Sequence, residues 1–561
     1  MDKLKANNVL RIEFIKDAHL KKPSILILMK KVLLPFLFLC ASLEVNAQQK
    51  PNIIVIMADD MGYSDIGCYG SEISTPNIDR LANNGVRLKQ FYNTGRCCPT
   101  RASLLTGLYA HNTGMGYMTG YDQNVPGYRG DLNKNCVTIA EALKPAGYKS
   151  YASGKWHVCS NIKPNGPKDN WPMQRGFDGY FGILQGSGSF FTPKTLTTGN
   201  KLVKATEGFY LTDAITDSAT DFIHRQAKNK NPFFLYVAYT APHWPLHAKE
   251  SDIAKYMKMY EQGWDKIRAQ RYKKQLALGI IERSVKLSNR EDSVPAWKDI
   301  PENKKALWVK RMAVYAAQID CMDQGIGRIT ESLYKNDLAD NTMIIFLADN
   351  GGCAEPIQRN QVALDKLGSD ESFESYYTPW ANVSNTPFRL YKTRLHEGGI
   401  HTPFIVSWPG HTAQNGSIIN NSPAHLIDLM PTFLEAAGAK YPSTYKEQNI
   451  HKLNGLSLLS VFKGNTLSDR TLYWEHEGNK AIRVKDWKLV SKSTDKIPYA
   501  GPWELYNLAT DKTELKNLAS KHPEKVRELD AIWNKWASEN NVLPINGTDM
   551  TGRGKMFARE H

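Results

Sequence analysis

The chain has 561 residues, of which 42% are hydrophobic and 10% aromatic, with 40 Gly and 28 Pro spread along it. This is the composition of a globular protein, so the disordered, collagenous and coiled-coil classes are excluded. The length allows a large core and more than one domain. The formal net charge is +15, from 71 Lys and Arg against 56 Asp and Glu, and such a surplus is compatible with a nucleic acid, an anionic membrane or a polyanionic substrate.

The position of the basic residues argues against nucleic acid. The first 47 residues hold eight basic and four acidic side chains, so +4 of the surplus lies there and +11 remains for the rest. The rest has no block of five or six consecutive Lys or Arg, no zinc-finger spacing and no RNP-like aromatic motif. We therefore expect no nucleic-acid partner.

The N-terminus has the pattern of a secretory signal. Lys30 and Lys31 precede the apolar run 32–41, and small residues occupy the positions before a cleavage site between Ala47 and Gln48. A run of about ten residues is too short to span a bilayer as a helix, so we expect no stable membrane anchor. Residues 1–47 are predicted to be a signal peptide, and the mature protein is predicted to be secreted or periplasmic.

Two alternatives concern the same segment. Met29 directly precedes the two lysines and would make a normal start for a signal peptide, so translation from Met29 is one hypothesis. A lipoprotein anchored at Cys40 would need a small residue before the cysteine, but Leu39 is not small. The seven cysteines that follow residue 47 show no regular spacing and indicate at most one or two disulfides.

Strands and helices alternate along most of the chain. Continuous apolar runs that are typical of strands buried on both faces occur at 53–58, 233–239, 343–348 and 404–408. Helical patterns lie between and after them, at 76–85, 138–146, 211–227, 304–334 and 425–437. The alternation predicts an α/β fold with a large, mostly parallel or mixed central sheet flanked by helices.

The pattern changes near residue 470. Short, closely spaced strands are predicted at 472–475, 481–484, 487–491 and 503–507, followed by an amphipathic helix at 523–537. We therefore predict a main domain over 48–469 and a smaller C-terminal α+β subdomain with a tail over 470–561, built on a short antiparallel sheet. The Lys-rich stretch 249–305 is predicted to be an irregular surface insertion.

The segment 97–107, Cys-Cys-Pro-Thr-Arg-Ala-Ser-Leu-Leu-Thr-Gly, carries the strongest chemical signal. It predicts a loop that enters a helix at Pro99, with Cys97 just before the helix N-terminus, where backbone N–H groups favour an anion. Arg101 lies one turn further and can point toward the same place. The alternative for an isolated pattern of this kind is a buried cysteine near the start of a helix.

Acidic residues follow two of the predicted strands. Asp59 and Asp60 come directly after the first strand, and Asp349 and Asn350 come after the strand at 343–348. In parallel sheets the functional groups gather at the carboxyl ends of strands. Three carboxylates and an amide oxygen form a hard oxygen shell suited to Ca²⁺ or Mg²⁺, although an acid pair alone is more often a plain strand end.

The segment 97–107 resembles the signature of the type I, formylglycine-dependent sulfatases of the alkaline-phosphatase superfamily. Three further segments resemble motifs of this family, in the family's order: Gly-Lys-Trp-His at 154–157, Ala-Pro-His-Trp-Pro at 241–245, and Lys392 ahead of Glu-Gly-Gly at 397–399. Each has an ordinary structural explanation when taken alone. Their joint occurrence carries the resemblance, which implies an alkaline-phosphatase-like fold and hydrolysis of sulfate esters.

The resemblance implies that a maturation enzyme oxidises Cys97 to formylglycine and that the hydrate of this residue is the nucleophile. The chemistry explains the modification, because a geminal diol supplies one hydroxyl to attack sulfur and keeps a second to expel the sulfate. An ordinary serine would have no comparable route to release it. The adjacent Cys98 occupies the variable position of the signature.

The resemblance also implies a role for each matching residue. The cation, Ca²⁺ or else Mg²⁺, would be bound by Asp59, Asp60, Asp349, Asn350 and the formylglycine at Cys97. The formylglycine would be held by Arg101 and Lys155. The sulfate would be contacted by Lys155, His243 and Lys392.

Three residues are implied to move protons. Asp349 would take a proton from the attacking hydroxyl, His243 would donate one to the leaving alcohol, and His157 would assist the elimination that restores the aldehyde. One departure from the family is His401, where many relatives carry Arg. It lies outside the matched site and affects the expected local packing more than the mechanism.

The substrate is predicted by resemblance alone. Residues 126–132 and 211–213 look like the bacterial arylsulfatase branch, which favours an exo-acting enzyme on a terminal sulfated sugar, such as 3-O-sulfated galactose of mucin-type chains, that also cuts aryl sulfates. Selectivity is expected from loops 185–193 and 249–305 and from Glu475-His476-Glu477. The alternatives are a phosphate mono- or diester or phosphonate hydrolase of the same superfamily and a non-catalytic sulfated-glycan-binding relative.

Overall fold

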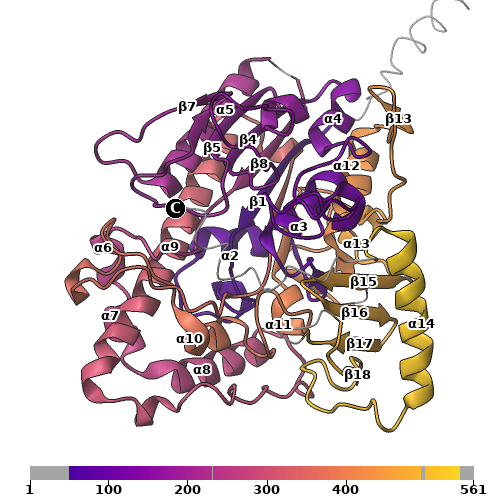
Figure 1. The fold of residues 1–561 in the computed structure, drawn as a ribbon. Coiled ribbons are helices and arrows are strands. Elements are labelled where there is room, and N and C mark those ends of the chain that lie inside the picture. The colour runs from indigo at the N-terminus through magenta and orange to yellow at the C-terminus, as the bar shows by residue number, and fades with distance from the viewer. Residues whose placement is uncertain (1–49, 230, 421, 494–498, 544–561) are drawn as a thin grey trace, which may run out of the picture. The chain divides into compact units, whose positions relative to one another are not determined.

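The computed structural model describes residues 50–229, 231–420, 422–493 and 499–543 (Figure 1). The predicted signal peptide at 1–47, its cleavage site, the alternative start at Met29 and the lipidation alternative at Cys40 lie outside these residues. Among the described residues, no helix is both long and apolar enough to cross a membrane.

A mixed sheet of ten strands forms the centre of the fold, in the order β11-β2-β10-β9-β1-β8-β4-β5-β6-β7. Its central strands are parallel: β9 (Thr342–Ala348), β1 (Asn52–Ala58), β8 (Phe233–Ala238), β4 (Lys149–Lys155) and β5 (Gly179–Ile183). The strands toward the edges are β10 (Phe404–Ser407), β2 (Val86–Leu88), β11 (Ser417–Ile419), β6 (Leu196–Thr198) and β7 (Lys201–Leu202). β10 and β6 are antiparallel to their central neighbours. The predicted large, mostly parallel or mixed sheet is confirmed.

Helices cover both faces of the sheet, and β1 shows how. Its residues are all buried, and they alternate between two core clusters, Ile54 and Ile56 in one and Ile53 and Val55 in the other. The first cluster includes residues of α2 (Pro76–Asn83), α5 (Leu211–Asn229) and α9 (Glu302–Lys335). The second includes residues of α3 (Cys97–Thr106), α4 (Ile139–Leu143) and α12 (Leu429–Ala437). A continuous apolar run is therefore required at β1.

The segment 249–305 differs from its prediction as an irregular surface stretch. It contains the helices α6 (Glu250–Ala254), α7 (Met257–Tyr260) and α8 (Gly263–Ala277). Trp264 packs into the first core cluster, and buried Arg271 pairs with Asp65 and Glu72 of the loop after β1. The expectation of irregular structure is wrong because apolar residues between the lysines give these helices a buried side.

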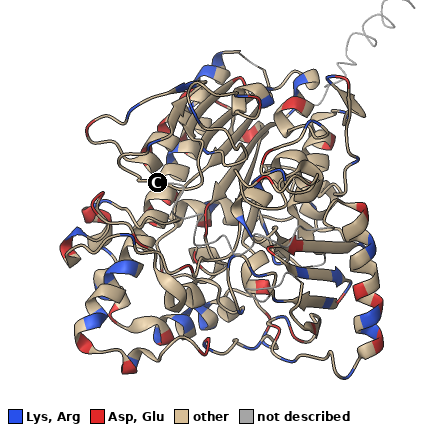
Figure 2. Ribbon diagram, viewed as in Figure 1, with Lys and Arg blue, Asp and Glu red and all other residues tan. Residues whose placement is uncertain are grey.

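The C-terminal sheet confirms the prediction of a small antiparallel unit. Its four strands are β15 (Thr471–His476), β16 (Asn479–Val484), β17 (Trp487–Ser491) and β18 (Trp503–Asn507). The helix α14 (Pro523–Glu539) packs on this sheet through Leu529 and Trp533, and it carries both signs of charge along its length (Figure 2). The boundary between residues 469 and 470 stays a prediction.

The remaining elements are short. The helices are α10 (Tyr377–Ser384), α11 (Glu397–Ile400) and α13 (Leu459–Phe462). The paired strands are β3 (Phe91–Tyr92) with β12 (Ala424–His425) and β13 (Thr444–Tyr445) with β14 (Gln448–Asn449).

The start of α4 offers a local test of the fold. The Thr138 hydroxyl accepts a hydrogen bond from the Glu141 N–H, and the Glu141 carboxylate accepts one from the Thr138 N–H, so both sides of a capping box are present. Thr138→Ala should lower the free energy of unfolding by about 1 kcal/mol. Chemical denaturation checks this value, with exposed Thr206→Ala as the matched control, for which less than about 0.5 kcal/mol is expected.

Candidate active site

The ends of β1 and β9 bring four oxygen-bearing side chains together. The two strands pair in register from Asn52–Thr342 to Ala58–Ala348, so Asp59 and Asp349 leave the sheet side by side. The Asp60 N–H donates to Asp349 Oδ1 at 3.0 Å, and Asn350 Nδ2 donates to Asp60 Oδ1 at 2.7 Å. All four side chains are buried. The predicted gathering of these residues at the carboxyl edge of the sheet is confirmed.

These four residues fit a hard cation. Asp59 Oδ1 and Asn350 Oδ1 are buried and accept no hydrogen bond from the described residues, although a buried polar atom normally has a partner. Ligand atoms of Asp59, Asp60 and His243 lie within 4.8 Å of one another. Carboxylate and amide oxygens are the ligands preferred by Ca²⁺ and Mg²⁺, which makes this the candidate metal centre.

Two cationic side chains flank the acids. Lys155 Nζ, at the end of β4, donates to Asp59 Oδ2 at 2.7 Å. Arg101 Nη2, from α3, donates to Asp349 Oδ2 at 2.9 Å and lies 3.4 Å from Asp59 Oδ1. Burial and the neighbouring Asp59 raise the pKa of Asp349 well above its usual range, against the opposing effect of Arg101.

Cys97 lies at the first turn of α3, whose N-cap is Arg96, so the helix starts two residues before the predicted entry at Pro99. Its thiol is 2% exposed. A hydrogen bond from Cys98 is the main cause that holds the pKa of Cys97 well below its usual value, and the positive charge of Lys155 acts in the same direction while burial opposes both. The position favours an anionic or strongly polar group at residue 97.

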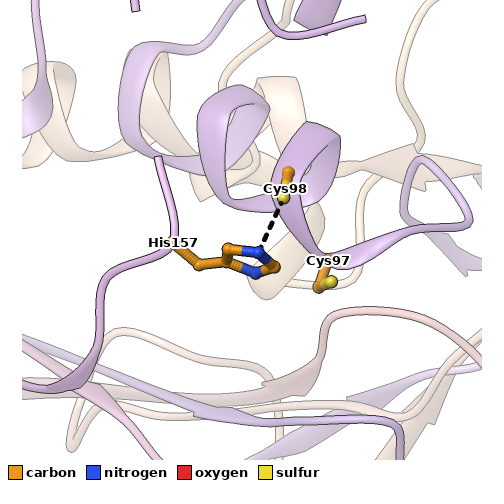
Figure 3. A group of neighbouring side chains, drawn as sticks. All are labelled: Cys97, Cys98 and His157. Carbon is orange, nitrogen blue, oxygen red and sulfur yellow. Dashed lines mark hydrogen bonds between the residues drawn. The ribbon is translucent and has the colours of Figure 1, made fainter. Parts of the chain in front are cut away.

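His157 faces the two cysteines from the loop after β4 (Figure 3). Its backbone φ is 53°, which turns the chain sharply after Trp156. Its Nε2 lies 3.1 Å from Cys98 Sγ, and its buried Nδ1 has no hydrogen-bond partner among the described residues. Burial lowers the pKa of His157. The predicted proximity of His157 to Cys97 is thus present.

His243 and Lys392 complete the group on the side of Asp60. Lys392 Nζ donates to Asp60 Oδ2 at 2.7 Å and lies 3.4 Å from His243 Nε2. His243 Nδ1 lies 2.5 Å from the Trp244 carbonyl oxygen. Since a carbonyl only accepts, the proton of the neutral ring is assigned to Nδ1, which leaves Nε2 as an acceptor. Burial lowers the pKa of His243 to about 3, so the ring is neutral in this site.

Three residues that sequence reasoning missed border this group. Tyr236 Oη, on β8, accepts from Arg101 Nη1 at 3.2 Å. Arg96 Nη1 donates to Glu355 Oε1 at 2.7 Å, and Glu355 Oε2 lies 3.9 Å from Lys392 Nζ. A tyrosine inside an otherwise apolar central strand was a usable signal for Tyr236, whereas Glu355 and Arg96 lie in loops with no distinguishing pattern.

The segments that were predicted to set substrate selectivity lie in different surroundings. Gly186 of the 185–193 loop packs on His157, since a Cβ there would lie 2.3 Å from the ring. Glu475 is committed to the interior, where His111 Nε2 lies 2.7 Å and Tyr128 Oη 3.1 Å from its carboxylate. His401 lies outside the catalytic group, as expected, with Nδ1 2.9 Å from Glu397 Oε2.

Comparison with known proteins agrees with this geometry. The family model described as Sulfatase matches residues 51–439, and the one described as N-sulphoglucosamine sulphohydrolase, C-terminal, matches residues 388–536. An uncharacterized sulfatase of Schizosaccharomyces pombe is 33% identical over 543 residues, covering 88% of this chain and 95% of that protein. An arylsulfatase of Klebsiella aerogenes is 35% identical over 440 residues, covering 74% and 92%.

A solved structure is also similar to this chain over most of its length. The crystal structure of Ps i-CgsB in complex with k-i-k-neocarrahexaose has a TM-score of 0.64 and 27% identity to this chain, covering 91% of this chain and 99% of that one. The family match extends over more than half of the chain and includes every residue of the group around Cys97. The chain therefore belongs to the sulfatase family and is a sulfuric ester hydrolase.

Proposed function

We propose that this sulfatase is secreted and acts through a formylglycine at Cys97 and a divalent cation, Ca²⁺ in preference to Mg²⁺, on a terminal sulfated sugar. The single observation that carries the mechanism is a buried group at the end of the parallel strands, in which Arg101 and Lys155 pair with Asp59 and His157 lies beside Cys97. A formylglycine hydrate at residue 97 would supply the nucleophilic oxygen. A maturation enzyme is required as a partner.

The cation would be held by Asp59, Asp60, Asp349 and Asn350, and when bound it would neutralise negative charge on the sulfate oxygens. Around it, Lys155 and Lys392 place two ammonium groups against buried carboxylates, at 2.7 Å from Asp59 and from Asp60. Preorganised cations in a buried site stabilise charge that develops in a transition state.

Proton movement is assigned to three groups. Asp349, which lies beside Asp59 and Asp60 with Oδ1 accepting from the Asp60 N–H at 3.0 Å, would accept a proton from the attacking hydroxyl. His243 would donate a proton to the leaving alcohol from Nε2, which takes up this proton from solvent when the sulfate anion binds beside it and favours the protonated ring. His157, with an unpartnered Nδ1, assists the step that restores the aldehyde.

A carbohydrate substrate is supported by the relatives and by burial. The protein of the similar solved structure binds k-i-k-neocarrahexaose, and the related Klebsiella protein is an arylsulfatase. Every catalytic side chain here is at most 5% exposed, so a group at the end of a substrate reaches the site more readily than one inside a polymer. This favours exo action on a terminal sulfated sugar, for example 3-O-sulfated galactose, with aryl sulfates as additional substrates.

The decisive experiment is peptide mass analysis of the segment around Cys97 after expression with a formylglycine-generating enzyme, joined to an activity assay. We expect the aldehyde mass in place of the thiol and hydrolysis of nitrophenyl sulfate faster than of nitrophenyl phosphate. A preference for phosphate would instead support a phosphatase of the same superfamily.

A second experiment identifies the sugar. It measures release of sulfate from defined mono-sulfated galactose, N-acetylglucosamine and N-acetylgalactosamine isomers, and equal rates on all would contradict an exo-specific enzyme.

Removal of the cation is a separate test. Chelation should lower kcat roughly 10²-fold, because the four oxygen ligands then hold no charge that neutralises the sulfate. Added Ca²⁺ or Mg²⁺ should restore activity, and Asp59→Asn should lower the affinity for the restoring cation. Activity that persists after chelation, with no metal detected by elemental analysis, would contradict the assignment of Asp59, Asp60, Asp349 and Asn350 as metal ligands.

A further inference from the structure

Cys97, Cys98 and His157 form a compact cluster of sulfur and nitrogen donors (Figure 3). One ligand atom from each lies within 4.8 Å of the others, and Cys98 Sγ is 3.1 Å from His157 Nε2. The three side chains are 2%, 0% and 3% exposed. The proposed mechanism uses Cys97 and His157, but it gives the Cys98 thiol no task.

The donor set has a clear metal preference as long as Cys97 is still a cysteine. Two thiolates and an imidazole select thiophilic cations over Ca²⁺ and Mg²⁺. Bond lengths of about 2.3 Å to sulfur and 2.0 to 2.1 Å to nitrogen place the ligand atoms of a tetrahedral zinc site roughly 3.5 to 3.8 Å apart. The observed separations therefore require only small side-chain movements.

The charge balance is also favourable. Binding of a divalent cation displaces one proton from each thiol, and the two thiolates then neutralise the metal, so the buried complex carries no net charge. The imidazole binds as a neutral ligand through the nitrogen that now faces Cys98.

We propose that the unmatured chain has a second metal site, for a thiophilic divalent cation such as Zn²⁺ or Cd²⁺, formed by Cys97, Cys98 and His157. The proposal rests on the proposed function only in naming Cys97 as the residue that is converted. Residue 97 would then be a sulfur ligand of the thiophilic site before maturation and, as formylglycine, an oxygen ligand beside Asp59 and Asp60 after it. Conversion of its sulfur to an oxygen group removes the thiophilic site, whereas a bound thiophilic metal occupies the sulfur that has to be converted.

The test uses the full chain expressed without a maturation enzyme and titrated with Cd²⁺ under reducing conditions and in excess Ca²⁺. The readouts are the ultraviolet thiolate-to-cadmium charge-transfer band and the stoichiometry by native mass spectrometry. We expect one Cd²⁺ per chain. Cys98→Ala should weaken binding by roughly tenfold or more, and the chain that carries formylglycine should show a loss at least as large.

Matched controls separate the site from general thiol chemistry. Cys136 is a buried free cysteine outside the cluster, and Cys136→Ala should leave Cd²⁺ affinity unchanged. Thermal unfolding without Cd²⁺ shows whether each variant is folded, and Cys98→Ser, which keeps a small polar side chain, should reproduce the loss if Cys98→Ala does not fold. Equal affinity in the wild type and in the folded Cys98 variant, or in the unmatured and matured chains, would overturn the proposal.

The two proposals fail in different ways. The Cd²⁺ titration does not measure sulfatase activity, so an inactive enzyme would leave it unaffected. A chain that keeps Cys97 as a thiol after co-expression with the maturation enzyme would contradict the proposed function while the Cd²⁺ result stands. A fully active matured enzyme with no Cd²⁺ site in its unmatured form would contradict only the inference about Cys98.

Discussion

Cys97→Ala is expected to abolish sulfate ester hydrolysis, with kcat lower by about 10⁴-fold or more relative to chains that carry formylglycine. Alanine cannot be converted to an aldehyde, so no hydrate is available to attack sulfur. The proposed sulfate contacts Lys155, His243 and Lys392 remain in this variant. Substrate binding, measured by calorimetry with the inactive variant, should therefore fall much less than turnover.

The comparison must be normalised to formylglycine content, because an unmatured wild-type chain would also be nearly inactive. Peptide mass analysis supplies the fraction converted. Cys321→Ala is the matched control, since Cys321 is a buried free cysteine on α9 that is outside the catalytic group. It should keep kcat within about twofold while costing roughly 1 kcal/mol of stability. Full activity in Cys97→Ala would refute the assignment of the nucleophile.

The sequence predicted the sheet and the proximity of the candidate metal ligands because both depend on short-range patterns. Apolar runs at 53–58 and 343–348 are typical of strands buried on both faces, and the carboxyl ends of parallel strands lie at the same edge of a sheet. Asp59 and Asp349 therefore had to lie together once the two strands were neighbours, as the register shows. Local chemistry and topology were sufficient for this part of the site.

The parts that sequence reasoning missed depend on long-range packing. Glu355 reaches Lys392 and Arg96 from a loop whose residues carry no periodic signal, and only the folded chain brings these three together. The helices within 249–305 were missed because their many lysines obscured the buried positions such as Trp264. The roles of Cys97, His157 and His243, and the nature of the substrate, stay predictions that rest on resemblance.

A buried network joins the C-terminal sheet to Glu397, the first residue of the Glu-Gly-Gly segment at 397–399. Lys488, on β17 and 0% exposed, lies 2.7 Å from Glu397 Oε1 and 2.8 Å from Glu514 Oε1. The Glu397 N–H donates to Glu514 Oε2 at 2.9 Å, and Tyr92 Oη donates to Glu397 Oε2 at 2.9 Å. The positive charge of Lys488 holds the pKa of Glu397 well below its usual range in spite of burial. The Lys488 ammonium group therefore pairs with two buried carboxylates, and Arg483 adds positive charge near Glu397.

This network bears on catalysis through the backbone of the Glu-Gly-Gly turn. Gly399, two residues after Glu397, accepts at its carbonyl from the Gly351 N–H at 3.0 Å, next to Asn350. The Lys392 N–H donates to the Gly352 carbonyl at 3.2 Å. The loop 350–352 is thus bonded both to Lys392 and to Gly399, and Lys488 contacts Glu397 from the C-terminal side. We therefore expect the small sheet to help position this loop.

Lys488→Met should consequently lower the free energy of unfolding by about 3 to 5 kcal/mol, because it leaves Glu397 and Glu514 buried without their cation. Loosening of the turn should also lower kcat by roughly tenfold or more, since small displacements of positioned groups are costly. Chemical denaturation and steady-state kinetics measure the two effects.

Adding Glu514→Gln to Lys488→Met removes one unpaired charge and should recover part of the stability. The matched control is Lys485→Met in the connection between β16 and β17, where the side chain is 67% exposed and pairs only with Asp469 among the described residues, and a change within about 0.5 kcal/mol is expected. Equal losses of unfolding free energy and of kcat in Lys488→Met and Lys485→Met would show that the buried network does not position the loop 350–352.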